Sequence, residues 1–285
     1  MVHHAKGRLT VAPPILECEQ LAQRYRTADG HQVIFEDLEF TIAGCGFVSV
    51  IGASGCGKST LLRLVLGSEQ PWKGTLRSSG EPITHPDRTR GIVFQKYSLF
   101  PHRTVLQNVT FGLELTSVRG PRRWFAGPWH KSPRHRLFED QAREYLSEVK
   151  LVEHADKYPH QLSGGMQQRV AIAQALIMKP RILLMDEPFG ALDPDAREAL
   201  QRTIVRVYHE HETTVLFVTH DLEEALYVGN RLLVLGKHPR RPGAGARIVL
   251  DQPITQGAPR GAKETQELLA HVRRAGFAPD PDADA

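Results

Sequence analysis

The octapeptide Gly52-Ala53-Ser54-Gly55-Cys56-Gly57-Lys58-Ser59 carries the strongest signal in this chain. It fits the pattern G-x-x-x-x-G-K-[ST], follows the apolar run 47–51 and precedes the apolar helical pattern 61–66. Glycines let such a loop wrap its backbone N–H groups around a phosphate, and the helix that follows adds the positive end of its dipole. We therefore predict a phosphate-binding loop in which Lys58 neutralises phosphate oxygens and the Ser59 hydroxyl binds Mg²⁺.

The composition is that of an ordinary globular protein. The chain has 285 residues, of which 41% are hydrophobic and 24% charged, which fits one large or two small domains and excludes a disordered or fibrous chain. No apolar run approaches the roughly 18 residues of a membrane span, and the N-terminus lacks the apolar core of a secretory signal. Three cysteines make no disulfide framework, so we expect an intracellular protein. The net charge of +4 is compatible with nucleic acid or anionic lipid and identifies neither.

Short apolar runs alternate with amphipathic segments along most of the chain. Strands followed by helices in this way predict a parallel α/β sheet, and the first 50 residues instead suggest short pieces of an antiparallel layer. Asp193-Pro194 is a helix start signal, an N-cap acceptor followed by proline. The expected parallel strands are 47–51, 182–185, 215–218 and 232–235, the expected helices are 166–177 and 196–207, and the antiparallel pieces are 14–18, 32–35 and 38–42.

Polar residues follow two of the predicted strands. Asp186 and Glu187 come directly after the run 182–185, and His220 follows the run 215–219. Ligands of open α/β sheets bind at the carboxyl edge where such strands end. We therefore expect Asp186 to hold Mg²⁺ and Glu187 to act as the general base toward water, with His220 close to a γ-phosphate. Taken alone, the two acids also fit a solvated strand end, and a single histidine is more often structural.

The segment Leu162–Gln168 (LSGGMQQ) opens the predicted helix 166–177. Ser163, Gly164 and Gly165 at a helix start leave exposed N–H donors and a positive dipole end, which makes a second anion site. A simple N-cap would also explain Ser163. The geometry of one chain does not explain why a second phosphate-binding helix start is present.

The phosphate-binding loop, LSGGMQQ, the run ILLMDEP at 182–188, GALD at 190–193 and His220 together resemble the ATP-binding subunit of an ABC transporter. The resemblance extends from about 14 to about 235 and is strongest to the bacterial nitrate, sulfonate and taurine importer group. It implies a P-loop NTPase (RecA-like) α/β core with an antiparallel β layer and an inserted helical subdomain. Ala53, His102 and Gln174 stand where this pattern usually has Pro, Trp and Arg, which leaves the subgroup open.

The resemblance also implies roles for individual residues. Two subunits pair head to tail in this family, so that the SGG helix start of one caps the γ-phosphate held by the other. Tyr25 resembles the aromatic that stacks on adenine, although a tyrosine beside a strand is the simpler alternative. The residues expected to contact ATP are Tyr25, Gly52, Ala53, Ser54, Gly55, Cys56, Gly57, Lys58, Ser59, Thr60, Ser163, Gly164, Gly165 and Asp193; Ser59, Gln95 and Asp186 are expected to hold Mg²⁺, and Glu187, His220 and Gln95 to act in catalysis.

The ATP-binding domain is assigned to residues 14–250, with the helical subdomain at about 96–165 and a short C-terminal tail at 251–285. A basic insertion at 119–136 carries six Arg or Lys, two Trp and no acidic residue. These cations could contact anionic lipid or an acidic partner loop, but a solvated, partly disordered loop is the expected alternative.

The function implied is hydrolysis of ATP by a homodimeric subunit at the cytoplasmic face of the membrane. It would power a separate permease that imports a small solute such as nitrate, sulfonate or taurine, served indirectly by a periplasmic binding protein. The alternatives are an ABC-type ATPase of lipid or export transport, or one of DNA maintenance. The latter class has coiled coils or zinc modules where this chain has only 67 residues between Gln95 and Ser163. Translation-associated ABC proteins carry two ATPase units per chain, and a non-enzymatic subunit would not need intact Lys58 and Glu187.

Overall fold

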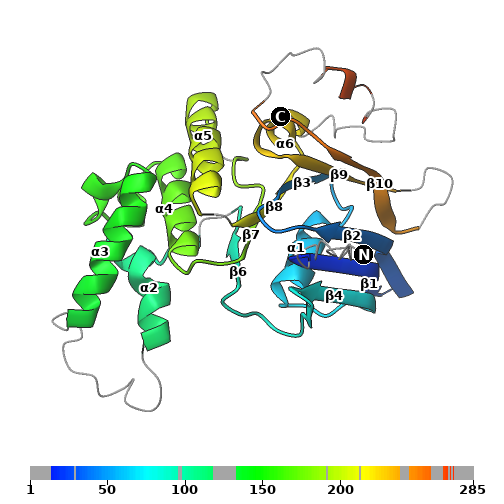
Figure 1. Ribbon diagram of the computed structural model, residues 1–285, viewed down its shortest axis with the longest axis horizontal. Helices are drawn as coiled ribbons and strands as arrows, with labels where there is room; N and C mark the ends of the chain where they lie inside the picture. Colours follow the sequence, from blue (N-terminus) through cyan, green and yellow to red (C-terminus); the bar gives the residue numbers. More distant parts are fainter. Residues whose placement is uncertain are drawn as a thin grey trace, which may run out of the picture.

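The strands of the described residues form one mixed sheet (Figure 1). The computed structural model describes residues 14–28, 30–95, 98–117, 133–190, 192–211, 213–237, 244–257, 266–268, 270 and 272. Within these residues the strand order is β5-β4-β1-β2-β10-β9-β3-β8-β7-β6. The strands are β1 (Leu16–Thr27), β2 (Gly30–Ile42), β3 (Phe47–Gly52), β4 (Lys73–Ser78), β5 (Glu81–Pro82), β6 (Arg90–Val93), β7 (Ile182–Asp186), β8 (Thr214–Thr219), β9 (Arg231–Lys237) and β10 (Ala246–Pro253).

The strands β6, β7, β8, β3 and β9 are parallel, as the alternation of strands and helices predicts. Alternate side chains of these strands enter two separate cores. Leu183 and Met185 of β7 pack in one core with α4 (Gly164–Leu176) and α5 (Pro194–His211). Ile182 and Leu184 pack in the other core with the leucines of α1 (Lys58–Leu66). Helices therefore cover both faces, which is the expected P-loop NTPase architecture.

The expected antiparallel layer consists of β1, β2 and β4. The prediction of two separate pieces at 32–35 and 38–42 is wrong, because both belong to the continuous strand β2. The strand is irregular where the pieces were divided: Leu21 pairs with Leu38 and Gln23 with Phe35, so β2 has one extra residue there. Asp37 occupies this bulge with a φ of 57°. The first piece is also longer than predicted, because β1 continues to Thr27.

Helices α2 (Val105–Ser117) and α3 (Pro133–Glu148) pack with α4 to one side of the sheet (Figure 1). Short 3₁₀ turns η3 (Val152–His154) and η4 (Pro159–Gln161) connect α3 to α4. The contacts between these helices are made by buried apolar residues, among them Val109, Ala142 and Val170. The end of the basic insertion differs from the prediction, because residues 133–136 form the first turn of α3. Residues 119–132 lie outside the described residues.

The chain returns to the sheet after α6 (Leu222–Val228) and β9. β10 pairs antiparallel with β9 and touches β2 through Ala246 opposite Phe35. β10 runs to Pro253, so the boundary predicted at residue 250 falls within a strand and is too early. Val272 is fully buried against α6 and β9, which joins part of the C-terminal segment to the core. No helix in the described ranges is both long and apolar enough to cross a bilayer.

The bulge in β2 yields a stability prediction. Asp37 is exposed and has a left-handed backbone conformation that costs a β-branched residue roughly 1–2 kcal/mol. Urea denaturation should show that Asp37→Val lowers the free energy of unfolding by about this amount, whereas Asp37→Gly leaves it unchanged or raises it by up to about 1 kcal/mol. Glu39→Val, at an exposed position of the same strand outside the left-handed region, is the control and should stay within about 0.5 kcal/mol of wild type. An Asp37→Val protein as stable as the glycine variant would contradict the prediction.

Candidate nucleotide-binding site

The phosphate-binding loop lies between β3 and α1, as predicted. Gly55 and Gly57 have φ values of 73° and 99°, in the left-handed region that glycine adopts readily. A Cβ at Gly57 would also lie 2.5 Å from Cγ2 of Ile34, so no larger residue fits without a shift. The Lys58 ammonium is nearly buried and donates to the backbone oxygens of Gly52, at 2.7 Å, and Ala53, at 3.4 Å. Its charge is thereby fixed against the loop.

A cavity of about 310 Å³ opens at this loop. It is lined by the loop, by the start of α1, by Glu187 and by the β2 residues Gln32 and Ile34. Cys56 does not line it: its side chain is buried in the core, so only its backbone can meet a ligand. The predicted nucleotide contacts that line the cavity are Ser54, Gly55, Gly57, Lys58, Ser59 and Thr60.

Ser59 and Asp186 meet at the carboxyl edge of the sheet. The Ser59 hydroxyl donates a hydrogen bond of 3.1 Å to Oδ1 of Asp186. Burial raises the pKa of the Asp186 carboxyl above its ordinary value, and the bond from Ser59 opposes that rise. A hydroxyl and a carboxylate oxygen at this spacing fit the oxygen ligands that Mg²⁺ prefers. Bound there beside the phosphates, Mg²⁺ would supply neutralisation of their charge.

Glu187 contacts both of the other residues predicted to act in catalysis. Its Oε2 accepts a bond of 3.4 Å from Nε2 of Gln95 and lies 3.2 Å from Nδ1 of His220. The backbone of Glu187 is in the left-handed region, with a φ of 45°, and its N–H donates to the oxygen of Val218 on β8. Strained residues of this kind cluster at functional sites. The fold therefore holds the carboxylate at the cavity at some cost to the local backbone.

The LSGG segment, residues 162–165, does not line this cavity. Ser163 caps α4, because its Oγ accepts a bond of 3.4 Å from the N–H of Met166. Gly165 packs against α5, since a Cβ there would lie 3.2 Å from Cβ of Ala196. None of the described residues lining the cavity comes from 162–168, and Figure 1 shows α4 beside α2 and α3, away from α1. One chain thus does not bring its two anion-binding helix starts together.

Hydrogen bonds restrain both Asp193 and Tyr25. Oδ1 of Asp193 accepts a bond of 2.9 Å from the N–H of Ala196, so the predicted start signal of α5 is confirmed. Tyr25, on β1, donates its hydroxyl to Oε2 of Glu69, at 2.5 Å, and accepts a bond from Arg63. Tyr25 is not among the described residues that line the cavity. It pairs in register with Gln32, and Gln32 does line the cavity. Contact between Tyr25 and adenine stays a prediction.

Comparison with known proteins settles the family. Residues 35–190, more than half of the chain, match the sequence profile described as ABC transporter. The chain belongs to the ABC transporter family. It is an ABC ATPase, a cassette that hydrolyses ATP to power transport.

Individual relatives agree with this. The nitrate import ATP-binding protein NrtD of Synechocystis sp. is 41% identical over 224 residues, 79% of each chain. The aliphatic sulfonates import ATP-binding protein SsuB 1 of Burkholderia lata is 44% identical over 231 residues, 81% of this chain and 63% of the relative. A post-hydrolysis dimer of the ATP-binding cassette MJ0796 with ADP and Pi superposes with a TM-score of 0.68 and 28% identity, covering 84% of this chain and 99% of that one.

The hydrogen bonds of the residues that flank His220 were not predicted from the sequence. Oδ1 of Asp221 caps α6 by accepting the N–H groups of Glu223 and Glu224. The Glu224 carboxyl is buried and accepts a bond of 2.8 Å from the Thr219 hydroxyl. Asp221-x-x-Glu224 has the spacing of a capping box, so the start of this helix was visible in the sequence. The burial of Glu224 was not, because it depends on packing between β8, α5 and α6.

The buried Glu224 should make stability depend on pH. Burial, assisted by the charge of Asp221, raises the pKa of this carboxyl from 4.5 to about 7. The folded state therefore holds the proton more tightly than the unfolded state. This contribution to the free energy of unfolding is fully present below pH 4.5 and is lost as the pH rises to about 7, a change of up to about 3 kcal/mol.

Urea denaturation of wild type and Glu224→Gln over this pH range tests the effect. The glutamine variant lacks the titrating group, so the difference in unfolding free energy between the two proteins should shift steadily toward the variant as the pH rises. A difference independent of pH would show that Glu224 titrates normally.

Proposed function

We propose that Lys58, Asp186, Glu187, Gln95 and His220 form one catalytic site for hydrolysis of Mg·ATP. The observation that carries this is the meeting of Gln95 and His220 on one oxygen of Glu187, at the cavity that Lys58 also lines. In this reading the loop amides and Lys58 bind the terminal phosphates. The Glu187 carboxylate accepts the proton of the attacking water. Gln95 and His220 orient that carboxylate, and their side chains would point toward the place where the γ-phosphate binds.

The proposed site is completed by a second copy of the chain. The SGG helix start presents backbone N–H groups at the N-terminus of α4, but it is not part of the cavity in its own chain. Head-to-tail pairing of two chains would bring Ser163–Gly165 of each to the phosphates bound by the other. Hydrolysis removes the γ-phosphate that this helix start grips. ATP would therefore favour the closed dimer and ADP the open one.

The free energy of this difference would drive a separate membrane permease. We propose that the chain acts at the cytoplasmic face in an importer of a small solute such as nitrate or a sulfonate. The names of the relatives NrtD and SsuB 1 support this choice. Uptake of labelled nitrate and of taurine in cells that lack the gene, with and without a plasmid copy, tests it; loss of neither uptake would exclude these solutes.

Substitutions at the site should separate binding from chemistry. Lys58→Ala should lower turnover at least about 100-fold through loss of charge at the phosphates. Glu187→Gln should lower kcat by about 10²–10⁴ while ATP still binds. Phosphate release and nucleotide binding are the measurements, and Glu81→Gln, at an exposed position of β5, is the control that should match wild type. A Glu187→Gln enzyme with near wild-type kcat would remove Glu187 from the role of base.

Mixing two inactive variants tests the shared site. Lys58→Ala disables the phosphate loop of one chain, and Ser163→Arg disables the helix start of another. A mixed dimer pairs one intact loop with one intact helix start, so an equal mixture should recover up to about a quarter of wild-type turnover if the two sites act independently. A site built within a single chain would give no recovery. In addition, Glu187→Gln should sediment as a dimer with ATP and as a monomer with ADP.

A further inference from the structure

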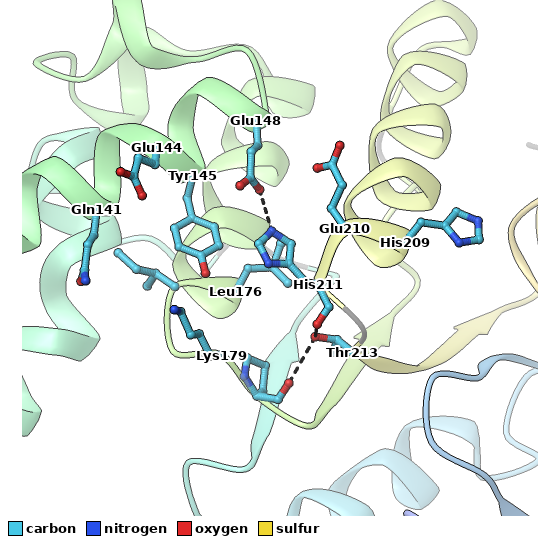
Figure 2. A pocket seen from close by; sticks show the side chains of 12 residues that line it. Gln141, Glu144, Tyr145, Glu148, Leu176, Lys179, His209, Glu210, His211 and Thr213 are labelled. Carbon is cyan, nitrogen blue, oxygen red and sulfur yellow. Dashed lines mark hydrogen bonds and ion pairs between the residues drawn. The ribbon is translucent and has the colours of Figure 1, made fainter.

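A second cavity, of about 530 Å³, lies where α3 and α5 end (Figure 2). It is bounded by the last turn of α3, by the last turn of α5 and by Lys179 and Pro180, which connect α4 to β7. It is at the opposite end of α5 from Asp193, and none of the proposed catalytic residues lines it. Three carboxylates, those of Glu144, Glu148 and Glu210, line it against the single ammonium of Lys179 among its described lining residues.

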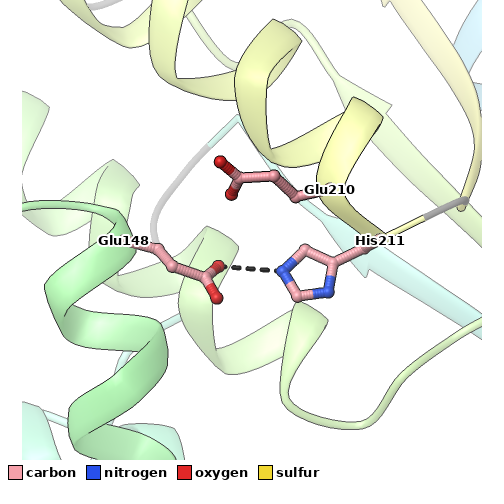
Figure 3. Close-up of side chains that lie close together, drawn as sticks. All are labelled: Glu148, Glu210 and His211. Atoms are coloured by element: carbon pink, nitrogen blue, oxygen red, sulfur yellow. Dashed lines mark hydrogen bonds and ion pairs between the residues drawn. The ribbon is translucent and has the colours of Figure 1, made fainter.

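Three side chains converge beside this cavity (Figure 3). One donor atom each of Glu148, Glu210 and His211 lies within 4.8 Å of the other two. Nε2 of His211 is already 2.8 Å from Oε2 of Glu148. The Tyr145 ring stacks on the imidazole, with ring centroids 5.2 Å apart and planes 19° apart, and thereby orients it.

We propose that Glu148, Glu210 and His211 bind a divalent transition-metal cation, for which Zn²⁺ is the probe. One imidazole nitrogen and two carboxylate oxygens form a donor set that zinc accepts, with water completing the tetrahedron. Mg²⁺ prefers oxygen ligands alone, so it should bind this set weakly. Zinc bonds of about 2.0–2.2 Å place tetrahedral donors about 3.5 Å apart. The 2.8 Å separation of Glu148 and His211 would therefore widen by about 0.7 Å, and the wider separations, which are at most 4.8 Å, would shorten by up to about 1.3 Å.

Among the described residues, Arg206 competes with a metal ion for Glu210. Arg206 lies 3.4 Å from Glu210 and also donates to the backbone oxygen of Glu148. The side chains of the Arg206–Glu210 pair are 42% and 45% exposed, and ion pairs this exposed to solvent are weak. A divalent ion can therefore displace Arg206 from the carboxylate. Glu148 lies on α3, in the group of helices beside the sheet, and His211 lies on α5, which packs on the sheet. The bound ion would therefore link α3 to α5.

Calorimetric titration of the full-length protein with ZnCl₂, without nucleotide, tests the site. The parent in this experiment carries His3→Ala and His4→Ala, because these two adjacent histidines could also bind zinc, and every variant is made in this parent. The parent should bind one Zn²⁺ that is lost, or weakened at least about tenfold, in His211→Ala and in Glu148→Gln. MgCl₂ should not compete for it. Zinc should also raise the melting temperature of the parent and not that of His211→Ala.

His209→Ala is the matched control, because this neighbouring histidine points away from the three ligands in Figure 2. It should keep the zinc stoichiometry and affinity of the parent. If His211→Ala does not fold, Glu210→Gln, an exposed and conservative substitution, decides in its place. The proposal is overturned if these ligand variants bind zinc as the parent does, or if His209→Ala loses as much binding as His211→Ala.

Discussion

The parallel pairing of β3, β8 and β7 is the constraint on which the catalytic site depends. These strands end at one edge of the sheet, where the phosphate loop, His220 and the Asp186–Glu187 pair follow them. The order of the strands thus brings together residues more than 160 positions apart in the chain. Because both faces of the strands are buried, a one-residue slip would turn each apolar set toward the opposite core and misplace the polar ends.

Charged groups at this edge are kept in place by the backbone as much as by one another. Lys58 is held by two carbonyl oxygens of its own loop, and Glu187 is held by the bond from its N–H to Val218. Both devices restrain a charge before any ligand arrives. Little reorganisation is then needed when a phosphate binds, which is the condition under which fixed charges act most strongly on a transition state.

Much of this could be predicted from the sequence, because the signals are local. The loop pattern Gly52–Ser59 indicates a backbone conformation, and Asp193-Pro194 indicates the start of a helix. The run Ile182–Met185 indicates a strand that is buried on both faces. The prediction that divided β2 into two pieces was wrong because it also relied on a local signal. Asp37 resembles a turn residue locally, but pairing with β1 on both sides of it keeps the strand continuous around a bulge.

The sequence by itself determined the family, the nucleotide loop and the residue types at the sheet edge, since each is written as a contiguous motif. Only the tertiary structure decided which side chains share an atom, such as the oxygen of Glu187 that Gln95 and His220 both approach. It also decided that Glu224 is buried and that Glu148 meets His211. The physical reason is that these contacts join segments 33 to 92 residues apart, or depend on how helices pack across a sheet, and neither has a periodic signature in the chain.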